Sequence, residues 1–172
     1  MSKNTIILIV IIAVLAVSVG IFAFINAGDL EQKKELEANS EFKISMGEEE
    51  YLVTMDDMKE IGLKDFQATK DTSYTDPTQI TYTGVQFKLI CEHLGIDLSK
   101  ATDVEFKALD GYSSAVAISD VLDDESIYIT VAEDGKALGT KSDGGDGPYM
   151  MITASSKFSQ SWCKYLEIAI IR

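Results

Sequence analysis

An uncharged apolar run near the N-terminus constrains this chain more than any other feature. Residues 5–25 contain no charged side chain. A helix of that length measures roughly 31 Å, which is about the thickness of a bilayer's hydrocarbon core. A cleaved secretory signal is the alternative, but its apolar region is usually shorter, and residues 25–27 match an Ala-x-Ala-like cleavage site poorly. We therefore expect an uncleaved transmembrane anchor over residues 5–26.

Charges beside this run predict its orientation. Lys3 is the only charged residue before it, whereas Asp29 and Glu31 follow closely. The positive-inside rule then favours a cytoplasmic segment over residues 1–4. A cleaved signal would export the remainder as well. We expect a single-pass protein of the cell membrane, with a polar stalk over residues 27–40 and an extracytoplasmic domain over residues 41–172.

The acidic character of the chain excludes one class of partner. The sequence has 28 acidic and 15 basic residues, a formal net charge of −13. Such a surface repels nucleic acid and anionic lipid headgroups, whereas a cationic ligand or a basic partner would be attracted. We expect contact with the membrane through the N-terminal helix and no binding to nucleic acid. A protein partner in the envelope is possible.

Short apolar segments typical of strands dominate the rest of the chain. They lie at residues 42–45, 51–54, 66–70, 80–82, 104–109, 112–118, 127–132, 149–154 and 164–171. One short helix is expected after Thr54, an N-cap residue, and ends at Gly62. Because strands dominate and do not alternate regularly with helices, the sequence predicts a mixed, β-rich α+β domain.

The clearest helix of the domain is expected over residues 84–94. Its apolar residues fall at i, i+3, i+4 and i+7, and Gly95 follows them. The stripe consists of Phe87, Ile90, Cys91 and Leu94. This face must pack against a core.

Two loops contain residues from which a ligand pocket could be built. Residues 110–112, Asp-Gly-Tyr, form a tight turn in which glycine accepts a positive φ. Residues 142–148, SDGGDGP, hold glycines that permit close backbone approach to a ligand, with a flexible connector as the alternative. The Tyr112 hydroxyl could line a pocket; the alternative is that its ring packs at the start of the following strand. The candidate pocket residues are Asp110, Gly111, Tyr112, Asp143, Gly144, Gly145, Asp146 and Tyr149.

The two cysteines leave alternatives open. Cys91 lies on the apolar helical stripe and is most simply a small core residue. Outside the cytoplasm it could pair with Cys163, and closing a loop of about 72 residues would stabilise the fold by roughly 4 kcal/mol. Two independent thiols and a metal or redox role are the other interpretations. We expect no metal site.

Four segments, taken in order, resemble one family, the sulfite oxidase-like molybdopterin-binding domain of molybdenum oxidoreductases. In that family a Gly-Val start leads a short helix, a strand ends in Asp-Gly-Tyr, a Gly-Pro precedes an apolar strand, and a Trp opens the closing strand. The segments are YTGVQFKLICEHLGID, DVEFKALDGYSSAVAISD, GKALGTKSDGGDGPYMMI and SWCKYLEIAI. The resemblance covers about residues 50 to 171 and implies the sulfite oxidase-type fold.

The resemblance also implies a cofactor whose anchors this chain lacks. Molybdenum in these enzymes is held by a cysteine thiolate on the loop before the first helix, and the segment from Lys64 to Gln79 contains no cysteine. The pterin phosphate is held by basic and histidine side chains. Here Tyr149-Met150-Met151 follows Gly-Pro where relatives commonly have an arginine, and the only histidine, His93, lies on the polar side of the helix.

The sequence therefore predicts a membrane-anchored extracytoplasmic binding or interaction domain, on a molybdopterin-oxidoreductase-like scaffold without its own metal ligand. We expect no catalytic residues and no cofactor. A molybdopterin-dependent oxidoreductase of the sulfite oxidase type is the first alternative, and molybdopterin would then be the cofactor. A small-ligand receptor that uses the two loops is the second.

Overall fold

The computed structural model describes residues 11–12, 14–19, 40–72 and 75–172. The chain divides into two units, Met1–Glu35 and Leu36–Arg172. In the first unit, residues 11–12 and 14–19 are helical. Within the described residues, no helix combines the length and apolar content needed to span a membrane. Most of the expected anchor (5–26) and stalk (27–40) lies outside the described residues, so both stay predictions.

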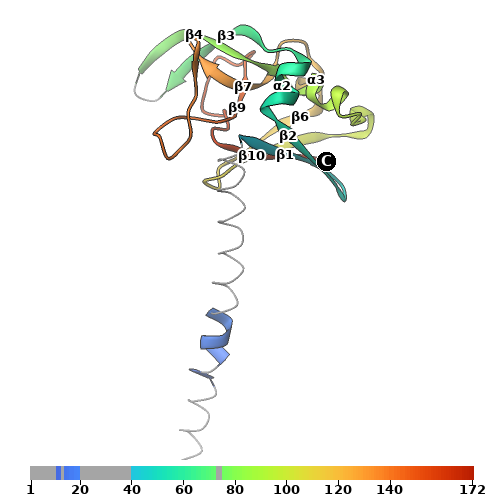
Figure 1. Ribbon diagram of the computed structural model, residues 1–172, viewed down its shortest axis with the longest axis vertical. Helices are drawn as coiled ribbons and strands as arrows, with labels where there is room; N and C mark the ends of the chain where they lie inside the picture. Colours follow the sequence, from blue (N-terminus) through green and yellow to red (C-terminus); the bar gives the residue numbers. More distant parts are fainter. Residues whose placement is uncertain (1–10, 13, 20–39, 73–74) are drawn as a thin grey trace, which may run out of the picture. The chain divides into compact units, whose positions relative to one another are not determined.

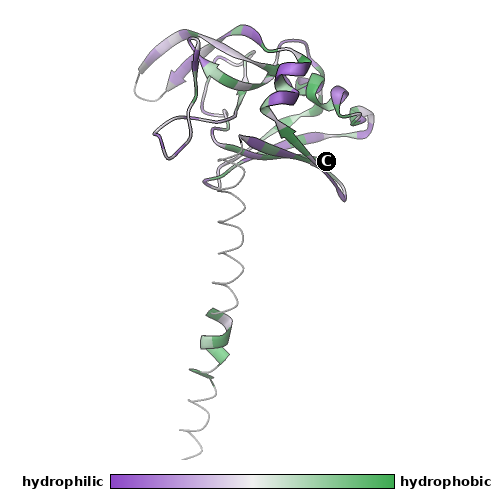
Figure 2. Ribbon diagram, viewed as in Figure 1, coloured by the Kyte–Doolittle hydropathy of each residue, from purple (hydrophilic) through white to green (hydrophobic). Residues whose placement is uncertain are grey.

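The first of two five-stranded sheets joins the start and the end of the folded unit. Its order is β2-β1-β10-β5-β6. The strands are β1 (Glu41–Met46), β2 (Glu49–Thr54), β5 (Asp103–Ala108), β6 (Ser113–Ala117) and β10 (Leu166–Ile171). The β1–β10 pair is parallel, whereas the other pairs are antiparallel. Hydrophobic and hydrophilic residues alternate along β1 and β5 (Figure 2), as expected of a sheet with one buried face, whereas the central strand β10 is almost entirely apolar.

The second sheet carries a long hairpin, β3–β4, which reaches the upper left of Figure 1. The sheet order is β3-β4-β7-β8, and β9 also pairs with β7. Its strands are β3 (Lys64–Thr72), β4 (Thr75–Gln86), β7 (Ile127–Glu133), β8 (Lys136–Ala137) and β9 (Met150–Thr153). Pro77 lies in the outer part of β4, before the residues that pair with β7, so its missing N–H interrupts no central ladder.

The main core joins both sheets to the helices. Phe42 of β1, Phe106 of β5 and Ile129 of β7 belong to one cluster of fully buried side chains. Helix α3 (Phe87–His93) reaches this core through Phe87, which meets Phe106 edge-on with ring centroids 5.0 Å apart. A smaller cluster lies apart from it: Ala68, Tyr82, Leu138, Met150, Ile152 and Trp162.

Helix α2 (Met55–Ile61) begins where its capping residues predict. The Thr54 hydroxyl accepts from the Asp57 backbone N–H, and the Asp57 carboxylate accepts from the Thr54 N–H at 2.8 Å. This reciprocal capping box satisfies two donors that a helix start leaves open. The helix ends at Gly62, whose φ is +110°.

The second helix starts later than the sequence pattern indicates. The expected helix covered residues 84–94, but β4 continues through Gln86 and α3 begins at Phe87. The reason is strand pairing: Gly84 pairs with Thr130 of β7, and a Cβ at Gly84 would overlap the Ile129 carbonyl oxygen. Three short elements were not expected: α4 (Ile118–Leu122), the single 3-10 turn Leu98–Lys100 and the two-residue strand β8.

Candidate functional site

The Asp-Gly-Tyr segment forms the turn between β5 and β6. Gly111 has a φ of +89°, and its N–H donates to the Ala108 carbonyl at 2.9 Å. The Asp110 carboxylate accepts from the Tyr112 N–H at 3.1 Å. Tyr112 is 42% exposed, and its hydroxyl donates to the Gln160 carbonyl at 2.8 Å. The turn therefore presents a carboxylate and a half-exposed ring at the surface.

The glycine-rich loop, residues 139–148, is held in shape by hydrogen bonds between its own backbone groups. The Gly145 N–H donates to the Thr140 carbonyl, the Asp146 N–H to Leu138, and the Gly147 N–H to Gly139. The Asp143 carboxylate accepts from the Thr140 hydroxyl at 2.7 Å. These bonds fold the loop back on itself.

Two of the loop glycines are required by this folding. A Cβ at Gly145 would overlap the Leu138 carbonyl oxygen, and one at Gly147 would lie 2.7 Å from the Leu138 Cβ. Gly144 is different, because it has open space around it and a φ of +76°. The absence of a Cβ thus allows Gly145 and Gly147 to pack closely against Leu138 and Gly139.

A first cavity, which we call the aromatic cavity, lies beside the β5–β6 turn. Its volume is about 270 Å³. Trp162 is 6% exposed, and its indole N–H has no hydrogen-bond acceptor among the described residues. Tyr165 joins the neighbouring loops, because its N–H donates to the Asp146 carbonyl and its own carbonyl accepts from the Leu109 N–H. The cavity is lined by Asp110, Tyr112, Ser159, Gln160, Trp162, Lys164 and Tyr165.

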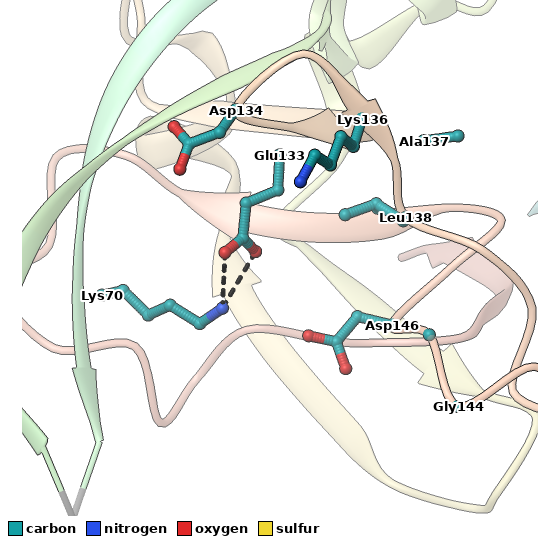
Figure 3. Close-up of a pocket in the computed structure, with 9 residues that line it drawn as sticks. Lys70, Glu133, Asp134, Lys136, Ala137, Leu138, Gly144 and Asp146 are labelled. Carbon is teal, nitrogen blue, oxygen red and sulfur yellow. Dashed lines mark hydrogen bonds and ion pairs between the residues drawn. The ribbon is translucent and has the colours of Figure 1, made fainter.

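A second cavity, the charged cavity, lies on the other side of the glycine-rich loop and has a volume of about 380 Å³. Figure 3 shows Lys70 and Glu133 pointing toward each other, with 2.9 Å from the lysine Nζ to each carboxylate oxygen. Asp146 is paired with Lys164 at 3.0 Å. The lining residues are Lys70, Glu133, Asp134, Lys136, Ala137, Leu138, Gly144, Gly145 and Asp146.

The smaller core cluster contains a second unsatisfied donor, Tyr82. Tyr82 is fully buried, and its ring meets Trp162 edge-on at 5.5 Å. Tyr82 is the register partner of Glu133 in the β4–β7 pair, so both side chains lie on one face of the sheet. The Tyr82 hydroxyl has no hydrogen-bond partner among the described residues. Burial and the nearby Glu133 carboxylate raise its pKa.

A third cavity contains none of the residues expected at the site. It has a volume of about 430 Å³ and is lined in part by Phe66 and Tyr128, whose rings stack with centroids 3.8 Å apart. Gln86 is at its edge, where its side-chain oxygen accepts from the Glu125 N–H. Its lining residues are Lys64, Asp65, Phe66, Gln67, Gln86, Glu125, Tyr128, Ala154 and Ser155.

The structure divides the predicted site residues among several places. Asp110 and Tyr112 line the aromatic cavity, whereas Gly144, Gly145 and Asp146 line the charged cavity. Gly111 shapes the turn and Asp143 bonds within its own loop. Tyr149 lies in the core, where it meets Phe42 edge-on and donates its hydroxyl to the Ser40 carbonyl at 2.6 Å.

Both cysteines are free in the structure, and both are fully buried. Burial raises the pKa of the Cys91 thiol to about 12. Burial, with a smaller effect from the Asp110 carboxylate, raises the pKa of the Cys163 thiol to about 12 as well. At neutral pH both side chains are therefore protonated thiols rather than thiolates.

Residues present in the cavities do not fit the molybdenum cofactor of the resembling family. The segment from Lys64 to Gln79 contributes Lys70 to the charged cavity, where it is paired with Glu133. That cavity carries three carboxylates and two lysines, an unfavourable set for a phosphate. In the described part of the chain, no group of three or more histidine, cysteine, aspartate or glutamate side chains is placed to hold a metal ion.

Several residues of the aromatic and the charged cavity were not predicted from the sequence. Glu133 lies 63 positions after Lys70, so only the sheet register brings the pair together. Trp162 was noted for opening the last strand, but no local pattern indicated that it lines a cavity. Tyr165, with a φ of +52°, was also missed, although a positive φ at an aromatic residue marks a constrained backbone.

Comparison with known proteins gives a likeness of fold alone. No family model matches the sequence, and no curated protein matches it. Among solved structures, the sulfane dehydrogenase SoxCD from Paracoccus pantotrophus matches 76% of this chain at a TM-score of 0.62 and 15% identity. The match covers 37% of that chain. The fold is thus mixed and strand-rich, with a distant structural neighbour that supports the expected sulfite oxidase-like scaffold.

Proposed function

We propose that this protein is a binding module on a sulfite oxidase-like scaffold, anchored in the cell membrane by residues 5–26 with its folded domain outside the cytoplasm. The observation that carries the proposal is the Lys70–Glu133 ion pair. The pair lines the cavity next to the glycine-rich loop. Lys70 comes from the segment that corresponds, by the resemblance, to the one in which the enzymes have their sulfur ligand.

The chemistry of this cavity supports binding rather than molybdenum redox reactions. Molybdenum needs a soft sulfur donor, and the pKa of both thiols is raised to about 12 by burial in the core. A fold acquires an activity only through its site, and in this chain the segment from Lys64 to Gln79 has no cysteine, while its Lys70 is paired with Glu133. The acidic surface favours a basic envelope protein or a cationic small molecule as the bound partner.

Molybdenum content tests this proposal directly. The full-length protein would be purified in detergent, and its molybdenum measured by elemental mass spectrometry beside a molybdenum oxidoreductase produced in the same host. We expect far less than one molybdenum per chain while the control enzyme is loaded. A stoichiometric amount in this protein would overturn the proposal in favour of the molybdopterin-dependent oxidoreductase.

The topology can be tested with a single surface cysteine. Lys157 is exposed, and the two native thiols are buried, so Lys157→Cys adds one reactive group. A membrane-impermeant maleimide should label this variant in intact cells. The matched variant Ser2→Cys should react only after the cells are permeabilised. The reverse pattern would contradict an extracytoplasmic domain.

A further inference from the structure

Two residues that line the aromatic cavity, Asp110 and Tyr165, already contact a cation of the protein itself. The Lys141 ammonium is 3.7 Å from an Asp110 carboxylate oxygen and 5.0 Å from the centre of the Tyr165 ring. A carboxylate combined with an aromatic face is the chemistry by which proteins recognise ammonium groups. The position of Lys141 therefore marks a cation subsite.

An external ligand can displace this lysine. Its side chain is 48% exposed and that of Asp110 is 36% exposed. Ion pairs with this exposure contribute little to stability, because water screens them and ordering two long side chains costs entropy. A cation that enters the cavity thus replaces a weak contact, while the Asp110 turn stays fixed by its own hydrogen bonds.

The rest of the cavity supplies more of a binding site. The Tyr112 ring stands at the rim, held by the bond from its hydroxyl to the Gln160 carbonyl. Trp162 also lines the cavity, so an incoming cation would meet a further aromatic ring. The volume of about 270 Å³ suits a small molecule.

We propose that the aromatic cavity binds a small organic cation, and that this ligand takes the place of Lys141 on Asp110 and Tyr165. The net charge of −13 raises the local concentration of such ligands. The inference rests on the proposed function, because it names the class of ligand that the binding module recognises.

Trp162 makes the experiment direct, since it is the only tryptophan of the chain. Choline would be titrated into the full-length protein in detergent while tryptophan fluorescence is followed. Its uncharged isostere, 3,3-dimethyl-1-butanol, is the matched ligand control. We expect a saturable change in fluorescence with choline and none with the alcohol. No saturable change with choline, or an equal change with the alcohol, would overturn the inference.

Variants then test the role of each group. Asp110→Asn should weaken choline binding about tenfold, and Lys141→Met should tighten it several-fold by freeing the subsite. Lys157→Met removes a lysine that lines neither cavity and should leave the affinity unchanged. If Lys157→Met tightened binding as much as Lys141→Met, general charge rather than displacement would explain the effect, and the inference would fail.

The two proposals fail separately. Absence of choline binding in protein that contains no molybdenum would overturn the cation site and leave the binding module standing. Stoichiometric molybdenum would overturn the binding module whatever the fluorescence shows. Because all three substituted side chains are exposed or half-exposed, circular dichroism of each variant should match that of the parent protein.

Discussion

The ring of Tyr82 meets the indole of Trp162 edge-on, with centroids 5.5 Å apart, and among the described residues neither polar group has a hydrogen-bond partner. Burial of a hydroxyl without a partner costs free energy. Tyr82→Phe keeps the ring contact and removes that cost. We expect the free energy of unfolding to be unchanged or raised by up to about 1 kcal/mol.

The control for this substitution is Tyr149→Phe. The Tyr149 hydroxyl is also buried, but it donates to the Ser40 carbonyl at 2.6 Å. Its removal should lower the free energy of unfolding by about 1 kcal/mol. Denaturant unfolding of both variants checks the pair. Equal losses in the two would mean that the Tyr82 hydroxyl has an acceptor.

Close packing of the glycine-rich loop predicts that alanine destabilises the protein more at Gly145 than at its neighbour Gly144. Gly145→Ala places a Cβ against the Leu138 carbonyl and should destabilise the protein by about 1–3 kcal/mol or more. Gly144→Ala meets open space, and its cost comes only from the φ of +76°, about 1–2 kcal/mol. Denaturant midpoints compare the two. A larger loss for Gly144→Ala would contradict the loop packing.

Thiol chemistry tests the state of the cysteines. Burial raises the pKa of Cys91 and of Cys163 to about 12, so neither should react with a thiol reagent at pH 8 in the native protein. In denaturant without reductant, both thiols should react. Recovery of both only after reduction would instead demonstrate a disulfide between Cys91 and Cys163.

The capping box of α2 predicts a pH-dependent contribution. Hydrogen bonds from Thr54 hold the pKa of Asp57 below its ordinary value. Because the folded pKa is the lower one, the stabilisation is complete above the unfolded pKa of about 3.9 and is lost as pH falls through the folded pKa. Asp57→Asn should cost about 1 kcal/mol at pH 7 and progressively less in acid.

The control for the capping box is Asp56→Asn on the same turn. The Asp56 side chain is 91% exposed and forms a surface ion pair with Lys59. Thermal unfolding from pH 7 down to pH 2.5 or so compares both variants with the parent protein. A constant difference between Asp57→Asn and the parent across this range would rule out a titrating cap.

A strand can be predicted from the sequence where polar and apolar residues alternate clearly. It cannot be predicted where pairing with a distant strand determines the structure. The segment that became β1 alternates strongly between buried and partly exposed residues, so its place could be predicted. The outer part of β4 is polar and contains Pro77, and only its long hairpin partner β3 makes it a strand. Helix α4 continues the apolar run of β6 without a break, so periodicity alone could not separate the two.

The candidate site could be predicted only in part, for a similar reason. The tight turn at residues 110–112 depends on local sequence, so the Asp-Gly dipeptide was enough to predict it. The partners of Asp110 come from elsewhere: Lys141 lies on the glycine-rich loop, and Trp162 precedes the last strand. These contacts depend on how distant segments pack, and a single sequence does not encode them in any short pattern.

The order of the first sheet has a consequence for synthesis. The last strand, β10, lies at the centre, between β1 and β5, rather than at an edge. Until the ribosome has released residues up to Ile171, β1 and β5 lack their common neighbour and the sheet cannot close. The first sheet should therefore close in one late step, once β10 has been synthesised and can pair with both of its neighbours.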